Sequence, residues 1–132
     1  MKEADIHEIW DFKFEHAWIF VVRGDLDIHL SMDLRDRLER ALAASPGAIL
    51  VDLEETSFMD SCAVEVLLAA RDKAQAAGAV LRLVAPSAPA RRLLNLTRTE
   101  SLFSIDSDLV TAYAPADGRT DPKKAAGFDD AA

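Results

Sequence analysis

The sequence predicts a single α/β domain built on a mixed β-sheet of about five strands with about four α-helices. Three observations lead to this fold class. The chain has 132 residues, which is enough for one ordinary domain. After two adjacent apolar runs, segments of strand composition alternate with segments of helical periodicity. Such alternation implies right-handed crossovers between mostly parallel strands, so only the first two strands are expected to be antiparallel.

The first two predicted strands form a hairpin. Residues 9–14 alternate loosely between apolar and polar side chains, and residues 17–22 read AWIFVV. A turn near Glu15-His16 would connect them. Trp10 and Trp18 fall in this hairpin and are expected to pack within it or in the core.

The first predicted helix covers residues 32–44. Ser31 stands where a helix N-cap is expected, and Ser45-Pro46-Gly47 ends the helical pattern. One face carries an apolar stripe at helical spacing. The opposite face predicts two i,i+4 ion pairs, Asp33 with Arg37 and Asp36 with Arg40.

The middle of the chain predicts a buried strand and a long helix. Residues 48–53 read AILVDL, as expected of a strand covered on both faces. After Phe58-Met59, an apolar repeat of three and four residues predicts a helix from Asp60-Ser61 to about Ala77. Gly78 then ends it.

The last elements are shorter. Residues 80–84 predict a strand, and Ser87 is expected to cap a helix with Pro89 in its first turn. Residues 102–105 predict a final short strand, and residues 107–113 a closing helical turn or two.

The composition changes at residue 114. From there the sequence is rich in alanine, proline and glycine and has no apolar period. Residues 1–113 are therefore assigned to the domain, and residues 114–132 to a flexible C-terminal tail with one aromatic side chain, Phe128.

Charge and composition exclude several classes of protein. The formal net charge of −8 argues against nucleic-acid binding, which needs clustered Lys and Arg. The N-terminal stretch MKEADIHEIW lacks the apolar core of a secretory signal, and no apolar run approaches the ~20 residues that span a bilayer. The single cysteine, Cys62, allows no internal disulfide. We therefore expect a cytoplasmic protein without membrane partners.

No assembled active site can be found in the sequence. The histidines His7, His16 and His29 all lie near the N-terminus, and neither a G-x-S-x-G motif nor a glycine-rich phosphate loop is present. One cysteine and three scattered histidines do not have zinc-ligand spacing. We expect no catalytic residue, no metal and no cofactor, and hence a protein that is not an enzyme.

The most informative segment is Phe58-Met59-Asp60-Ser61. It follows the central strand and begins a helix, so it lies at the sheet edge where open α/β sheets bind ligands. The simplest reading is structural, with Asp60 or Ser61 acting only as an N-cap.

The segment F-M-D-S resembles the phosphorylation motif of the STAS-domain anti-sigma factor antagonists. Upstream, Gly24-Asp25-Leu26-Asp27 resembles the G-E-L-D segment of that family. The resemblance covers about residues 10–113. Further landmarks follow in the family's order: Gly78, residues 80–84, residues 87–94 with Arg91-Arg92, and Leu102-Phe103.

The resemblance implies a binding protein. Members bind an anti-sigma factor that is a serine kinase and release its sigma factor. The kinase phosphorylates a serine and so ends binding, and a serine phosphatase restores it. Carried over to this chain, Ser61 is the phosphoacceptor, and the expected partner-binding residues are Asp25, Asp27, Asp60, Ser61, Cys62 and Glu65.

The chain departs from the family directly after the acceptor. Cys62 and Ala63 stand where the family usually has a second hydroxyl and a glycine. An alternative therefore stays open: a STAS-like interaction module that is not phosphorylated and acts as a subunit of a larger regulatory or transport assembly, or as a ligand sensor.

Overall fold

The computed structural model describes residues 6–113. The first five residues and the predicted tail, residues 114–132, lie outside the described residues. In chain order the elements are β1 Glu8–Phe14, β2 Ala17–Leu26, α1 Ile28–Ala43, β3 Ala48–Met59, α2 Ser61–Ala76, β4 Val80–Val84, α3 Ala88–Leu96, a 3₁₀ turn Glu100–Leu102, β5 Ser104–Asp106 and α4 Leu109–Tyr113.

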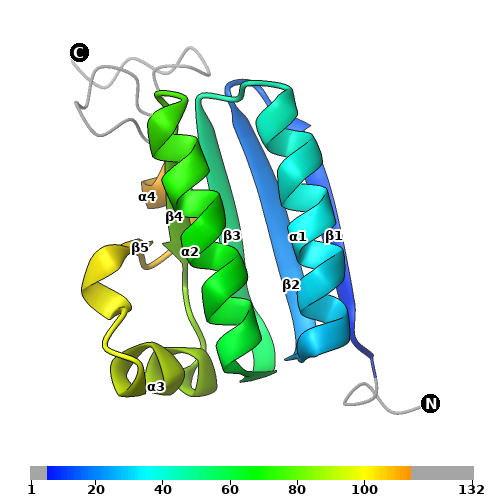
Figure 1. The fold of residues 1–132 in the computed structure, drawn as a ribbon, viewed down its shortest axis with the longest axis vertical. Helices are drawn as coiled ribbons and strands as arrows, with labels where there is room; N and C mark the ends of the chain where they lie inside the picture. Colours follow the sequence, from blue (N-terminus) through cyan, green and yellow to red (C-terminus); the bar gives the residue numbers. More distant parts are fainter. Residues whose placement is uncertain (1–5, 114–132) are drawn as a thin grey trace, which may run out of the picture.

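The five strands form one mixed sheet in the order β1-β2-β3-β4-β5. β1 is antiparallel to β2, and every later pair is parallel. Helices α1 and α2 lie side by side across one face of this sheet (Figure 1). The predicted fold class, with its N-terminal antiparallel hairpin, is confirmed. No helix within residues 6–113 is long and apolar enough to cross a bilayer.

Strands β2 and β3 run further than the sequence predicted. Their apolar runs end at Val22 and Leu53, but the strands continue to Leu26 and Met59, which pair with each other. The predictions rested on the apolar runs AWIFVV and AILVDL, whereas the extensions are largely polar and contain register shifts, so no apolar run marks them. The extension matters because it carries both strands to one edge, where α1 and α2 begin.

The N-cap of α1 is Asp27, and the assignment of Ser31 was wrong. The Asp27 carboxylate accepts a hydrogen bond from Leu30 N, so the helix starts one turn earlier. Ser31 lies inside the helix and is fully buried, and its hydroxyl has no hydrogen-bond partner in the described part of the chain. The predicted pair of Asp33 and Arg37 forms, and Arg37 also contacts Asp11 of β1.

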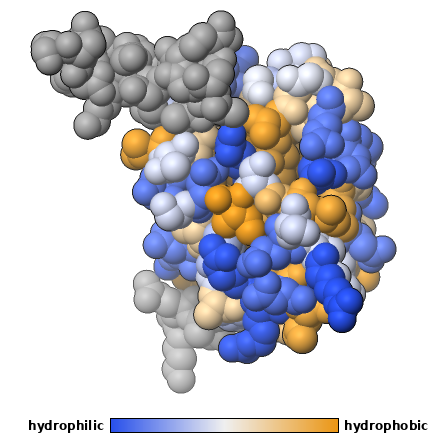
Figure 2. All heavy atoms as spheres, turned by 90° about the vertical axis from the view of Figure 1, so that its left-hand side faces the viewer, coloured by the Kyte–Doolittle hydropathy of each residue, from blue (hydrophilic) through white to orange (hydrophobic). Residues whose placement is uncertain are grey.

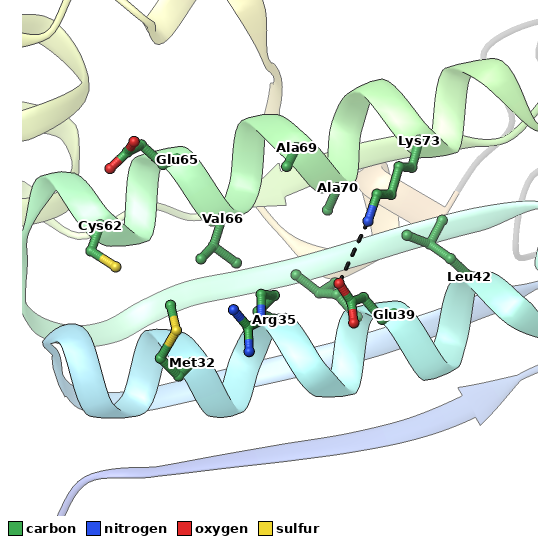
Figure 3. A pocket seen from close by; sticks show the side chains of 11 residues that line it. Met32, Arg35, Glu39, Leu42, Cys62, Glu65, Val66, Ala69, Ala70 and Lys73 are labelled. Carbon is green, nitrogen blue, oxygen red and sulfur yellow. Dashed lines mark ion pairs between the residues drawn. The ribbon is translucent and has the colours of Figure 1, made fainter.

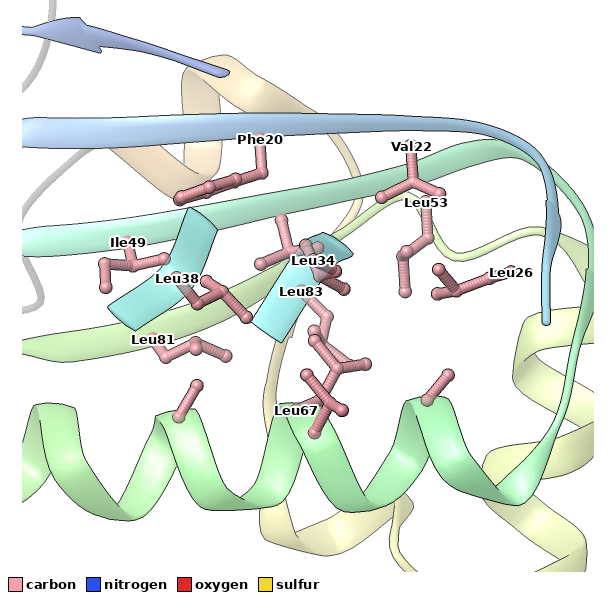
Figure 4. Close-up of a cluster of buried hydrophobic side chains, with 14 of the residues drawn as sticks. Phe20, Val22, Leu26, Leu34, Leu38, Ile49, Leu53, Leu67, Leu81 and Leu83 are labelled. Carbon is pink, nitrogen blue, oxygen red and sulfur yellow. The ribbon is translucent and has the colours of Figure 1, made fainter. Parts of the chain in front are cut away.

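The main core lies between the sheet and the helices α1, α2 and α3. Side chains of β2, β3 and β4 point toward Leu34 and Leu38 of α1 and Leu67 of α2 (Figure 4). Close packing here fixes both helices on the sheet, and thereby the position of their N-termini. The largest fully buried side chains are Phe20, Leu26, Leu34, Leu38, Ile49, Leu50, Leu53, Leu67, Leu83 and Leu94, with Val22 and Val51.

A smaller cluster covers part of the opposite face. Leu50 and Val84 pack there beneath α4, whose Tyr113 donates a hydrogen bond of 2.7 Å to the Glu15 carboxylate. The last strand is shifted from its expected place at residues 102–105. Residues 100–102 form a 3₁₀ turn, and β5 begins only at Ser104.

The two tryptophans of the hairpin differ. Trp18 is half-buried, as expected, and its Nε1 donates a 3.0 Å hydrogen bond to Asp11. Trp10 is largely exposed, so it is not part of the core, and within the hairpin it only lines a small surface hollow with Val21 and Arg23. Alternation along β1 places it on the sheet face that α1 does not cover.

Candidate functional site

The predicted site lies at the carboxyl edge of β2 and β3. Because Leu26 pairs with Met59, the residues that follow them, Asp27 and Asp60, leave neighbouring strand ends. Each caps the helix that begins there. Two helix N-termini and two carboxylates therefore meet at one edge of the sheet.

Asp60 fixes the start of α2. Its Oδ1 accepts hydrogen bonds from Cys62 N at 3.0 Å and Ala63 N at 3.3 Å. Ser61 is consequently the first helical residue, and its side chain is exposed, without a hydrogen bond to any described residue. The structure thus presents the Ser61 hydroxyl to solvent at a helix N-terminus.

Asp27 has the same role at α1. The hydrogen bond from Leu30 N, 3.0 Å long, is the main reason that the pKa of Asp27 lies below its ordinary value of 3.8, and the charge of His29 acts in the same direction. Asp27 is therefore ionised at neutral pH.

Asp25 joins the same edge through contacts that the sequence did not suggest. Its carboxylate accepts a 2.8 Å hydrogen bond from the Ser57 hydroxyl, and its backbone N–H donates to His7 Nδ1 at 2.7 Å. Sequence reasoning missed His7 and Ser57. The only signal for Ser57 was its position shortly before the F-M-D-S segment.

Gly24 has a steric reason to be glycine. Its φ is +92°, and a Cβ at this position would lie 2.3 Å from the carbonyl oxygen of Ile6. Only glycine allows the segment before β1 to pass so close. This close approach brings His7 to Asp25, so the conformation of the G-D-L-D segment contributes directly to the site.

Cys62 projects from α2 toward α1, and Glu65 lies on the outer side of the same helical turn (Figure 3). Both line a groove of about 320 Å³ between the two helices (Figure 3). An ion pair of 3.5 Å between Lys73 and Glu39 spans this groove. The other residues that line it are Met32, Arg35, Leu38, Leu42, Val66, Ala69 and Ala70.

Exposed apolar side chains lie on the segment before Ser61 and on α1 and α3. Phe58 is 48% exposed and Leu96 of α3 is 74% exposed, and together with Arg92 they line a shallow hollow of about 170 Å³. Ile28, the first residue of α1, is also exposed. Phe58 was predicted only as part of the F-M-D-S motif, and no local pattern marks Ile28 or Leu96 as exposed.

The arrangement combines an exposed hydroxyl, several carboxylates and an apolar fringe, which are features of a protein-docking surface. Among residues 6–113, no group of three or more His, Cys, Asp or Glu side chains is arranged to hold a metal ion.

Solved structures with the same fold include two anti-sigma factor antagonists. The protein from Mycobacterium paratuberculosis has a TM-score of 0.75 at 22% identity, covering 86% of this chain and 96% of that one. Unphosphorylated SpoIIAA has a TM-score of 0.72 at 21% identity, covering 87% and 99%. The phosphorylated form of Bacillus SpoIIAA has a TM-score of 0.64 at 20% identity, covering 82% and 96%. At these identities the likeness establishes the fold.

The sequence comparisons establish the family. A STAS-domain containing protein of Pseudomonas aeruginosa (strain UCBPP-PA14) is 34% identical over 84 residues, which are 64% of this chain and 82% of that protein. The family model of the STAS domain matches residues 13–112. Since this match spans most of the chain, the protein belongs to the STAS domain family.

Proposed function

We propose that this protein is an anti-sigma factor antagonist: it binds an anti-sigma factor that is a serine kinase, frees the sigma factor held by that kinase, and loses the partner when Ser61 is phosphorylated. The observation that carries the proposal is the exposed Ser61 hydroxyl at the N-terminus of α2, in a STAS domain. Its structural neighbour SpoIIAA exists in both unphosphorylated and phosphorylated forms.

The chemistry around Ser61 indicates what the partner surface looks like. Asp25, Asp27 and Asp60 make the edge acidic, and Phe58 and Ile28 add exposed apolar area. A partner with an apolar centre and a basic rim would complement this surface. Cys62 and Glu65 continue it into the groove toward α1 and complete the proposed docking face.

Phosphorylation would change this face more than it changes the fold. Transfer of the γ-phosphoryl group of ATP to Ser61 Oγ adds roughly −1.5 to −2 charges. The N-terminus of α2 favours the added charge by ~0.3–1 kcal/mol, so the domain tolerates it. The neighbouring carboxylates repel the added charge, and next to the apolar centre of the docking face the phosphate adds bulk and would lose its water shell on binding, a cost that opposes the contact even when the partner has a basic rim. A loss of ~3 kcal/mol in binding lowers affinity more than a hundredfold.

Exposure of Ser61 also supports the reverse reaction. A hydroxyl at the first helical position is accessible to a serine phosphatase as well as to the kinase. The proposed cycle takes place in the cytoplasm, where ATP is available, and needs no cofactor bound to this protein.

The first test is the intact mass of the full chain purified from its own cells, before and after phosphatase treatment. We expect the mass of one phosphoryl group to appear and to vanish with phosphatase and in Ser61→Ala. Ser57→Ala is the matched control, because Ser57 lies four residues earlier at the same edge. Modification that survives in Ser61→Ala would contradict the assignment.

The second test concerns binding to the kinase identified by ATP-dependent labelling. Ser61→Asp should weaken the complex. Ser45→Asp should not, since Ser45 is exposed in the loop that precedes β3, whereas Ser61 follows the other end of that strand. Equal binding of both variants would contradict the switch.

The groove between α1 and α2 favours a second candidate. Its apolar floor and charged rim could hold a small ligand in a STAS module that is not phosphorylated. If the protein stays unmodified under growth and stress alike, this ligand sensor, or a constitutive subunit of a larger assembly, becomes the better account.

A further inference from the structure

Among residues 6–113, the outer side of β1 is an unpaired sheet edge. β1 pairs with β2 along its whole length of seven residues, and within the described part of the chain no strand pairs with its other side. Figure 1 shows it at the right-hand margin of the sheet. The opposite edge, β5, has only three residues, and the side of the molecule that carries it shows apolar patches separated by hydrophilic ones (Figure 2). Long unpaired edges are templates for another strand.

Three aromatic side chains project from one face of this edge. Trp10, Phe12 and Phe14 alternate along β1 and are 61%, 48% and 50% exposed. Phe14 contacts Tyr113 of α4 at a ring-centroid distance of 5.4 Å. Among residues 6–113, α4 makes no ring contact with Trp10 or Phe12. So large an exposed aromatic row is unusual on a surface without a partner.

The hairpin geometry decides which backbone groups are free. Phe14 and Ala17 flank a two-residue turn, and such a pair exchanges both of its hydrogen bonds. Alternation then directs the backbone groups of Trp10, Phe12 and Phe14 toward β2. The N–H and C=O groups of Ile9, Asp11 and Lys13 point to the open side.

We propose that this edge pairs with β1 of a second copy of the same chain, antiparallel and with Phe12 opposite Phe12. The two five-stranded sheets then become one continuous sheet. Trp10 of each copy lies opposite Phe14 of the other, which builds an aromatic ladder across the symmetry axis. This pairing is separate from the proposed docking face, because Ser61 lies at the end of β3.

Charge selects this register over its neighbours. With Phe12 at the centre, Asp11 of each copy lies opposite Lys13 of the other. A shift centred on Asp11 or on Lys13 would put like charges opposite each other, which is destabilising. Lys13 is exposed and makes no ion pair among residues 6–113. Asp11 is held in place by Arg37 and Trp18 and retains lone pairs for Lys13 of the second copy.

The test is the mass of the full chain in solution, measured by light scattering over a range of concentrations. We expect a concentration-dependent dimer. Phe12→Ser and Lys13→Glu should each raise its dissociation constant about tenfold or more. Leu96→Ser and Arg92→Glu are the matched controls. They make changes of the same kind, apolar to polar and cation to anion, at exposed positions of α3 and should leave the dimer unchanged. Thermal unfolding checks that every variant is folded.

Amide hydrogen exchange provides an independent readout that does not depend on variants. In the dimer, the outward N–H groups of Ile9, Asp11 and Lys13 should become protected as concentration rises, while those of Trp10 and Phe12 are protected throughout. A wild-type chain that stays monomeric at millimolar concentration would overturn the proposal. So would a dimer insensitive to Phe12→Ser and Lys13→Glu. If the wild-type chain were monomeric and only the Phe128→Ala variant formed a dimer, the edge of β1 would be assigned to the C-terminal segment of the same chain. That result would also overturn the proposal.

Discussion

Replacing Asp60 with alanine removes the acceptor that begins α2. One oxygen, Oδ1, accepts from both Cys62 N and Ala63 N, at 3.0 and 3.3 Å. Loss of an Asp N-cap costs about 1 kcal/mol, within a range of roughly 0.5–2 kcal/mol. For a domain of this size, a loss of about 1 kcal/mol corresponds to a fall in melting temperature of about 4 °C. Asp60→Asn keeps the acceptor and loses only the charge, so its free energy of unfolding should stay within about 0.5 kcal/mol of wild type.

The assay is urea unfolding of the three proteins side by side, followed by far-UV circular dichroism. Equal slopes with a shifted midpoint for Asp60→Ala would identify a loss of stability in the folded protein. If Asp60→Asn were as unstable as Asp60→Ala, the charge rather than the cap would stabilise α2, and the reasoning would be refuted. An unchanged Asp60→Ala would refute it as well.

Two further predictions concern the core and the second cap. Leu67→Ala opens a cavity at a fully buried position and should lower the free energy of unfolding by about 2–5 kcal/mol. Leu96→Ala, at an exposed position, should change it by less than about 0.5 kcal/mol. Urea unfolding measures both values, and equal losses would contradict the packing described. Because the pKa of Asp27 is lower in the folded protein than its unfolded value of 3.8, the ionised carboxylate stabilises the fold at pH values above 3.8. This contribution is lost as pH falls through the folded pKa. The difference in unfolding free energy between wild type and Asp27→Asn should therefore narrow from about pH 6 to about pH 3. A constant difference would contradict it.

Local patterns in the sequence were sufficient for most elements. Ser87 was predicted to cap α3, and its Oγ accepts a hydrogen bond from Ala90 N at 3.3 Å. The same reasoning failed at α1, because Ser31 precedes an apolar stripe just as a cap would. The helix instead begins where the extended β2 ends, so Asp27 is the cap and Ser31 is buried in the second turn.

The candidate site was only partly visible in the sequence. Resemblance to a family singled out Ser61 and the aspartates, and the structure brings Asp25, Asp27 and Asp60 to one edge of the sheet. The contacts of Asp25 with His7 and Ser57 join residues 18 and 32 positions apart, and no local pattern encodes such pairs. Exposure of Phe58 and Trp10 was equally invisible, since apolar composition alone favours burial.

Local sequence patterns were enough to predict the α/β class, the order of the elements and the position of Ser61 at the start of a helix, because periodicity and capping act over a few neighbouring residues. The ends of β2 and β3, the carboxylates that share an edge with Ser61, and the open side of the hairpin became known from the three-dimensional structure alone. These outcomes depend on strand register. The pairing of Leu26 with Met59 places two distant segments side by side, and the alternation along β1 puts its aromatic row on the sheet face that α1 and α2 do not cover.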